Sequence, residues 1–215
     1  MGELVYAEPI RLESSKVVYA TESNKIEKSI SRYFHTNVRH IFGGVMFTVA
    51  FFLFAYKGYE GRAGSVSRWG WFGDKLYVPD NIVGNVACIC AIIGVLFPTT
   101  IANEQNLDFV VWIHYLFSVS FFLCLAYFSL FSFTRRKESA DYESRKRQRG
   151  NIYLLCGIVM LVCICALIVA TILRDKSKPE GTYVFWIESV SFWVFGISWF
   201  VKGETILKDV ESKMS

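Results

Sequence analysis

Residues 151–173 read NIYLLCGIVMLVCICALIVATIL and contain no charged side chain. An α-helix rises about 1.5 Å per residue, so a run of this length crosses the roughly 30 Å hydrocarbon core of a bilayer. Only α-helices and closed β-barrels satisfy the backbone hydrogen bonds there, and this run lacks the alternating pattern of a barrel strand. The segment therefore predicts a transmembrane helix.

Four further apolar segments bring the number of predicted spans to five. Together the spans cover approximately residues 40–56, 82–101, 109–133, 151–173 and 183–201. Because 53% of the 215 residues are hydrophobic, the chain also has more apolar material than a soluble domain of this length buries in one core. We expect an all-α integral membrane protein, a five-helix transmembrane bundle over residues 39–203. A polar N-terminal tail (1–38) and a short C-terminal tail (204–215) would flank it.

The positively charged residues predict how this bundle is oriented. Residues 134–150, between the third and fourth spans, hold Arg135, Arg136, Lys137, Arg145, Lys146, Arg147 and Arg149. The link between the second and third spans holds no Lys or Arg. By the positive-inside rule the basic link is cytoplasmic, which places the N-terminus outside and the C-terminus in the cytoplasm. The same basic side chains are a candidate site for anionic lipid headgroups.

Two ionisable residues, His114 and Glu188, lie within the predicted spans. Such groups cost several kcal/mol at membrane depth unless they are paired or hydrated, so each is a functional hypothesis. Both lie about six positions from the outer ends of their spans, and we expect them at one depth, roughly 8 Å below the outer surface. Ser118 and Ser191 extend the two polar helix faces. The pair predicts either a hydrogen bond between helices or an outward-facing cavity for a lipid or small amphiphile.

The outer side also holds the candidate metal ligands and a candidate lipid anchor. In the predicted topology His35, His40 and His114 are all on this side, and with Glu188 they provide donor types that zinc accepts. Their spacing is not that of a known zinc motif, and the alternative is that His35 and His40 are interfacial side chains. Arg39 at the same boundary is a candidate partner for a lipid phosphate or for the ligand of the cavity.

Motifs of nucleophilic, nucleotide-dependent and zinc-protease catalysis are missing from the sequence. It contains no G-x-S-x-G, no Walker-type glycine loop and no H-E-x-x-H, and we therefore predict no catalytic residues. No recognisable nucleic-acid-binding pattern accompanies the basic residues. The sequence favours a non-enzymatic protein without a cofactor, whose partners are membrane lipids. Two alternatives remain open, a metal-dependent intramembrane hydrolase and a channel or pore formed by a homo-oligomer.

Several motifs resemble those of a group of uncharacterised bacterial polytopic membrane proteins. The shared motifs are SISRYFHTNVR (29–39), FGG (42–44), YKGY (56–59), LFPT (96–99), HY (114–115), RGNIY (149–153), FWIES (185–189), FGISW (195–199) and KG (202–203). The resemblance covers about residues 29–203. It implies a polytopic protein of the bacterial inner (cytoplasmic) membrane.

A more distant resemblance links the chain to the damage-regulated autophagy modulator and GPI-lipid-remodelling membrane proteins. It rests on the order of an Ile-Ser element, here Ile30-Ser31, ahead of a helix, followed by a histidine in a middle helix, here His114. Those proteins have six helices with the Ile-Ser element in an outer loop, so this chain would lack their first helix. The resemblance implies lipid handling and an outer N-terminus.

Overall fold

The fold is known from a computed structural model. It describes residues 26–58, 65–98, 108–137, 144–173 and 181–203. Residues 1–25, which make up most of the predicted N-terminal tail, and the predicted C-terminal tail (204–215) lie outside these ranges.

Within the described ranges the chain is almost entirely helical. The helices are η1 (Ile30–His35), α1 (Arg39–Ala55), α2 (Gly70–Lys75), α3 (Asp80–Leu96), α4 (Asp108–Tyr127), η2 (Phe128–Ser132), α5 (Ser144–Ile172) and α6 (Tyr183–Lys202). One two-residue antiparallel ladder joins β1 (Ser65–Val66) to β2 (Arg136–Lys137). η1 is a 3₁₀-helix, and η2 is a π-helical turn that continues α4. Each predicted span overlaps one long helix, and the third also includes η2.

Three of these helices are long and apolar enough to cross a membrane. They occupy Phe109–Ser132, Arg147–Ile172 and Tyr183–Lys202. The other two apolar helices, α1 and α3, are shorter, with 17 residues each. The prediction of an all-helical protein with membrane-compatible helices is thus confirmed.

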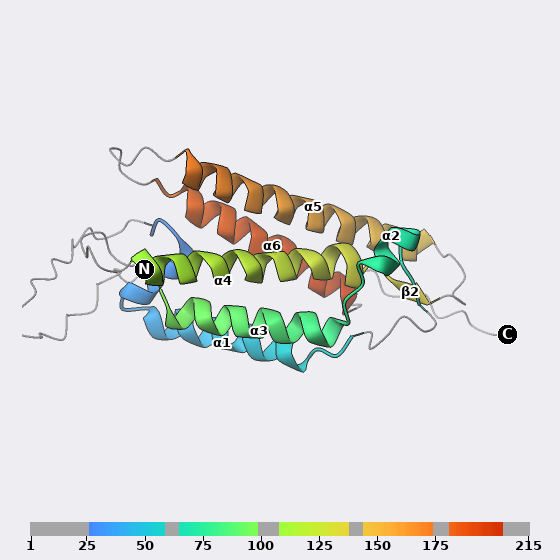
Figure 1. Cartoon of the computed structure of the whole chain (residues 1–215), viewed down its shortest axis with the longest axis horizontal. Coiled ribbons are helices and arrows are strands. Elements are labelled where there is room, and N and C mark those ends of the chain that lie inside the picture. The colour runs from blue at the N-terminus through green and yellow to red at the C-terminus, as the bar shows by residue number, and fades with distance from the viewer. Residues whose placement is uncertain (1–25, 59–64, 99–107, 138–143, 174–180, 204–215) are drawn as a thin grey trace, which may run out of the picture.

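The long helices lie side by side, each antiparallel to the one before it in the chain (Figure 1). α1 packs on α3, α3 on α4, α4 on α5, and α5 on α6. As a result η1 lies at one end of the bundle, whereas α2 and β2 lie at the other. We call these the η1 end and the α2 end. The basic link that the sequence places in the cytoplasm belongs to the α2 end, so the η1 end is the predicted outer end.

Prolines set both ends of α3. The helix begins directly after Pro79, and Asp80 places a carboxylate in its first turn, where the helix dipole favours negative charge. It ends at Leu96 because Pro98 disfavours helical backbone at the residue before it, Phe97, whose φ and ψ are −116° and 71°. α3 is therefore shorter than the predicted span, which extends to residue 101.

The helices pack closely at the α2 end of the bundle. An aromatic cluster of Tyr56, Phe128, Phe133, Phe195 and Trp199 joins three segments there, the end of α1, η2 and α6, with ring centroids 4.9 Å apart for Tyr56 and Trp199. α1 and α3 also approach closely, since a Cβ at Gly84 would collide with the backbone carbonyl of Leu53. Nearer η1, a cavity lies between the helices of the described part of the chain.

Candidate functional site

A partly open cavity lies beneath η1, between α1, α3, α4 and α6. It is lined by Ile30, Ser31, Phe42, Met46, Cys90, Ala91, Gly94, Val95, His114, Ser118, Phe121, Phe122, Glu188 and Phe192. The centre of a water molecule can occupy about 50 Å³ of it. That is room for roughly three to five waters, or for one small polar group with a few methylenes. The cavity brings together three of the predicted ligand-binding residues, His114, Ser118 and Glu188.

His114 is held in place by the end of α3. Its Nδ1 lies 2.9 Å from the carbonyl oxygen of Phe97 and 3.2 Å from that of Gly94. Both partners are acceptors, so Nδ1 carries the proton and donates to them. In the neutral ring this leaves Nε2 as an acceptor, and the Ser118 hydroxyl donates to it over 3.3 Å. His114 is only 4% exposed, and both it and Ser118, the partner of Nε2, are among the residues that line the cavity.

Glu188 fastens η1 to α6 across the cavity. Its Oε2 accepts a hydrogen bond of 2.7 Å from the backbone N–H of Ile30, the first residue of η1. A second backbone bond, in which Phe185 donates to the carbonyl of Lys28 over 2.9 Å, joins the same two segments. The Tyr33 and Phe185 rings also meet there, with centroids 6.0 Å apart. Ile30 and Ser31, held in this way, form the roof of the cavity.

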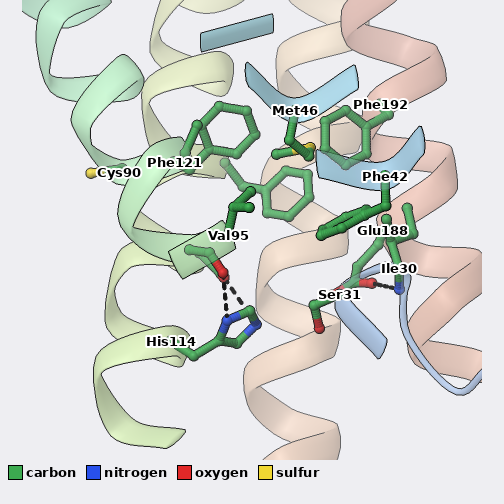
Figure 2. Close-up of a pocket in the computed structure, with 14 residues that line it drawn as sticks. Ile30, Ser31, Phe42, Met46, Cys90, Val95, His114, Phe121, Glu188 and Phe192 are labelled. Carbon is green, nitrogen blue, oxygen red and sulfur yellow. Dashed lines mark hydrogen bonds between the residues drawn. The ribbon is translucent and has the colours of Figure 1, made fainter. Parts of the chain in front are cut away.

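Figure 2 shows how the polar groups are arranged around this space. His114 and Glu188 lie on opposite sides, and Ser31 on the roof lies between them in this view. Among the hydrogen bonds of the described residues, none joins His114 directly to Glu188. The helix–helix hydrogen bond that the sequence left open is therefore not how these residues are used here. The opposite part of the wall is apolar and contains Phe121 and Phe192.

Two further residues predicted to bind the ligand lie away from the cavity. Ser191 is 1% exposed, and its hydroxyl donates to the carbonyl of Ile187 in its own helix over 3.0 Å. Arg39 is exposed at the start of α1, where its Nε donates to His40 over 3.3 Å. Neither residue is among those that line the cavity.

The predicted zinc donors do not converge. Across the described ranges no three His, Cys, Asp or Glu side chains form a group that could hold a metal ion. His40 is exposed on α1, His35 packs its ring against Phe34 in η1, and His114 is bound to α3. In the part of the chain that the structure describes, the four predicted donors are therefore not arranged as one zinc site.

The basic residues predicted to bind lipid headgroups differ in their surroundings. Arg135 is buried at the α2 end, where its Nη2 lies 3.1 Å from Asp74 Oδ1 and its guanidinium stacks on Tyr77. Arg149 is also buried, whereas Arg147 is exposed. Of the remaining four, Arg136 and Lys137 form β2, and Arg145 and Lys146 lie in the first turn of α5. Arg135 therefore has a structural role, and its predicted headgroup contact has no support from its position.

The sequence reasoning missed the contribution of η1. Residues 1–38 were predicted to be a tail, but Ile30 and Ser31 are part of the cavity wall. A single 3₁₀-helix of six residues has too few turns to produce a hydrophobic period. The sequence feature that could have indicated these residues is the Ile-Ser element, Ile30-Ser31, on which the distant family resemblance rests.

No family model, no curated protein and no solved structure matches this chain.

Proposed function

We propose that this is a non-enzymatic membrane protein that binds a lipid or small amphiphile in the cavity beneath η1. His114 and Glu188 would orient its headgroup, and the apolar wall would receive the first part of its chain. The observation that supports this most is the convergence of the two intramembrane ionisable residues on one partly open cavity with an apolar lining. A cavity of this kind, mostly apolar with a few convergent polar groups, is the usual form of a small-molecule site.

The size of the cavity limits how much of a ligand it takes up. Its 50 Å³ is far below the roughly 300–1,000 Å³ of pockets that enclose a whole drug-sized ligand. A headgroup and a few methylenes fit, and the rest of the chain would stay in the surrounding bilayer. A single-chain amphiphile entering from the membrane meets this requirement.

The proposed topology has five spans, with the η1 end outside and the α2 end in the cytoplasm. α1 and α3, with 17 residues each, are at the lower limit of the roughly 17–25 residues that cross a bilayer. The positive-inside rule supports the orientation, because the basic link is at the α2 end. In this topology the cavity is in the outer leaflet, and the family resemblance favours the bacterial inner membrane as its location.

The proposal is tested by the amount of lipid that co-purifies with His114→Asn. The asparagine amide can still donate to the α3 carbonyls that Nδ1 binds, but it lacks an equivalent of Nε2. We expect the variant to retain its thermal stability and to carry about fivefold less bound amphiphile, which corresponds to the loss of one net hydrogen bond of about 1 kcal/mol. Lipid content per protein is measured by mass spectrometry of extracts from the full chain.

The matched control is Ser120→Ala, which removes a hydroxyl from the same helix but outside the cavity. Ser120 only donates to the carbonyl of Leu116 in its own helix, over 2.8 Å. This variant should keep the wild-type lipid content. Equal lipid content in wild type, H114N and S120A would refute a headgroup role for His114.

A further inference from the structure

None of the polar side chains that line the cavity in the described structure is a permanent cation. Those that line it are the hydroxyls of Ser31 and Ser118, the imidazole of His114 and the carboxyl group of Glu188. Among the described lining residues there is no Lys and no Arg. The cavity thus contains a carboxyl group but no permanent positive charge.

The hydrogen bonds of His114 and Glu188 leave acceptors on the cavity side. Because Nδ1 is used by the α3 carbonyls, the nitrogen that remains for a ligand is the accepting Nε2. Its bond to Ser118 is long at 3.3 Å, so a ligand donor can replace the serine hydroxyl, which is free to rotate. Among the described residues Glu188 accepts one hydrogen bond, from the Ile30 N–H to Oε2, whereas a carboxylate accepts about four.

The described η1 segment and the start of α1 contain the cations Lys28, Arg32 and Arg39, and none of them is among the residues that line the cavity. Arg32 forms an ion pair with Glu27, at 3.7 Å, and Arg39 contacts His40. A phosphate or carboxylate headgroup placed in the cavity would therefore face the Glu188 carboxyl group with no Lys or Arg among the described lining residues. Burial of an unpaired charge is unfavourable, and proximity to a like charge makes it more so.

We infer that the ligand is a single-chain amphiphile whose head donates hydrogen bonds and carries no negative charge. A hydroxyl, as in a monoacylglycerol, or an ammonium group has this chemistry, whereas a fatty acid or an alkyl phosphate does not. The inference rests on the proposed function and adds the headgroup class. Nε2 of His114 accepts from the head, and Glu188 is the group that discriminates against anions.

The test measures saturable binding of radiolabelled monolaurin and radiolabelled laurate to the full-length protein in nanodiscs. The two probes have the same chain and differ in the head. Dodecylamine and dodecyl phosphate serve as unlabelled competitors. We expect monolaurin to bind saturably and dodecylamine to displace it at comparable concentration. Half-saturation by laurate, and displacement of monolaurin by dodecyl phosphate, should each need an at least tenfold higher concentration.

Variants of Glu188 separate a charge effect from a loss of the roof. Glu188→Gln keeps an acceptor for Ile30 but removes the charge. The affinity for monolaurin should therefore change by less than about twofold, while the ratio of monolaurin affinity to laurate affinity falls. Ser191→Ala, on the same helix outside the cavity, should change neither probe.

Two different failures can be distinguished. Saturable laurate binding that equals or exceeds monolaurin binding would overturn the headgroup class and leave the proposed function standing. If the ratio of monolaurin affinity to laurate affinity is the same in E188Q as in the wild type, Glu188 does not discriminate against anions. If neither probe binds saturably to the wild type, the proposed function itself fails.

Discussion

Arg135→Ala is expected to lower the free energy of unfolding by about 2–4 kcal/mol, the largest effect of any single substitution that we predict. The Arg135 side chain is 1% exposed, and it pairs with Asp74 at 3.1 Å. Its guanidinium carbon lies 4.2 Å from the centre of the Tyr77 ring. The estimate is below the full range for a buried pair because Asp74 is 39% exposed, which weakens the attraction.

Tyr77 remains a suitable partner for this cation over the whole physiological pH range. Burial, followed by the nearby Asp80 carboxylate, raises the pKa of Tyr77 to about 12. The phenol is therefore neutral below that pH, and the stacking contact does not titrate between pH 5 and 9.

The measurement for Arg135→Ala is unfolding in mixed micelles by titration with a denaturing detergent. Arg68→Ala is the matched control, because Arg68 is exposed and binds the Asn151 side chain over 2.8 Å. This control should lose less than about 1 kcal/mol, as surface interactions do. If R135A were no less stable than R68A, Arg135 would be a surface cation, as its place in the basic link suggested.

The second large effect is expected in hydrogen exchange of η1 after Glu188→Ala. The variant removes the only side chain that accepts the Ile30 N–H in the described structure. A buried donor without its acceptor costs about 1–3 kcal/mol, so amide exchange over residues 29–36 should accelerate by about tenfold or more. Exchange is followed by mass spectrometry on the folded protein.

Two further variants show whether the effect comes from this bond. Glu188→Gln retains an acceptor at the same position, and its η1 should exchange at close to the wild-type rate. Ser191→Ala removes a bond internal to α6 and should have no effect on η1. Equal exchange of η1 in the wild type and E188A would show that Glu188 does not hold the roof.

The long helices could be predicted from the sequence because their signal is local. Each is a long run with few charges, and a bilayer accepts only a few backbone conformations for such a run. The ends were predicted less well where a single residue terminates the helix, as Pro98 does for α3. α5 also begins earlier than its apolar run, at Ser144, since helix geometry continues into the polar residues outside the hydrocarbon.

The meeting of His114 and Glu188 was predictable for a different reason. Helical rise converts a position in the sequence into a depth. Because α4 and α6 run in the same direction, residues equally far from their outer ends lie at equal depth and have a fair chance of lining the same space. The depth of a residue does not determine the direction in which its side chain points, however. Ser191 was grouped with Glu188 on one helix face, but its hydroxyl bonds within α6 and lies outside the cavity.

Contacts between segments distant in the sequence could not be predicted. The Trp69 indole N–H donates to the carbonyl of Leu130 over 2.9 Å, at the π-helical turn η2. Likewise Arg135 and Asp74 belong to two different links, and neither link has a regular pattern. The packing of the helices brings these groups together, so the local sequence does not predict which of them form contacts.

The most direct test of ligand binding in the cavity is photo-crosslinking with two diazirine-bearing amphiphiles, a monoacylglycerol and a fatty acid. The full-length protein in nanodiscs is irradiated with each probe, and the modified residues are mapped by mass spectrometry. Excess unlabelled amphiphile with the same head is the competitor.

We predict that at least one probe modifies the cavity residues Phe121, Phe122 or Phe192 and that the competitor suppresses these adducts. Adducts at exposed residues such as Phe109 and Trp112 should resist competition, because they report general contact with lipid. If both probes modify only such exposed residues, with no competed adduct in the cavity, the proposed site is contradicted.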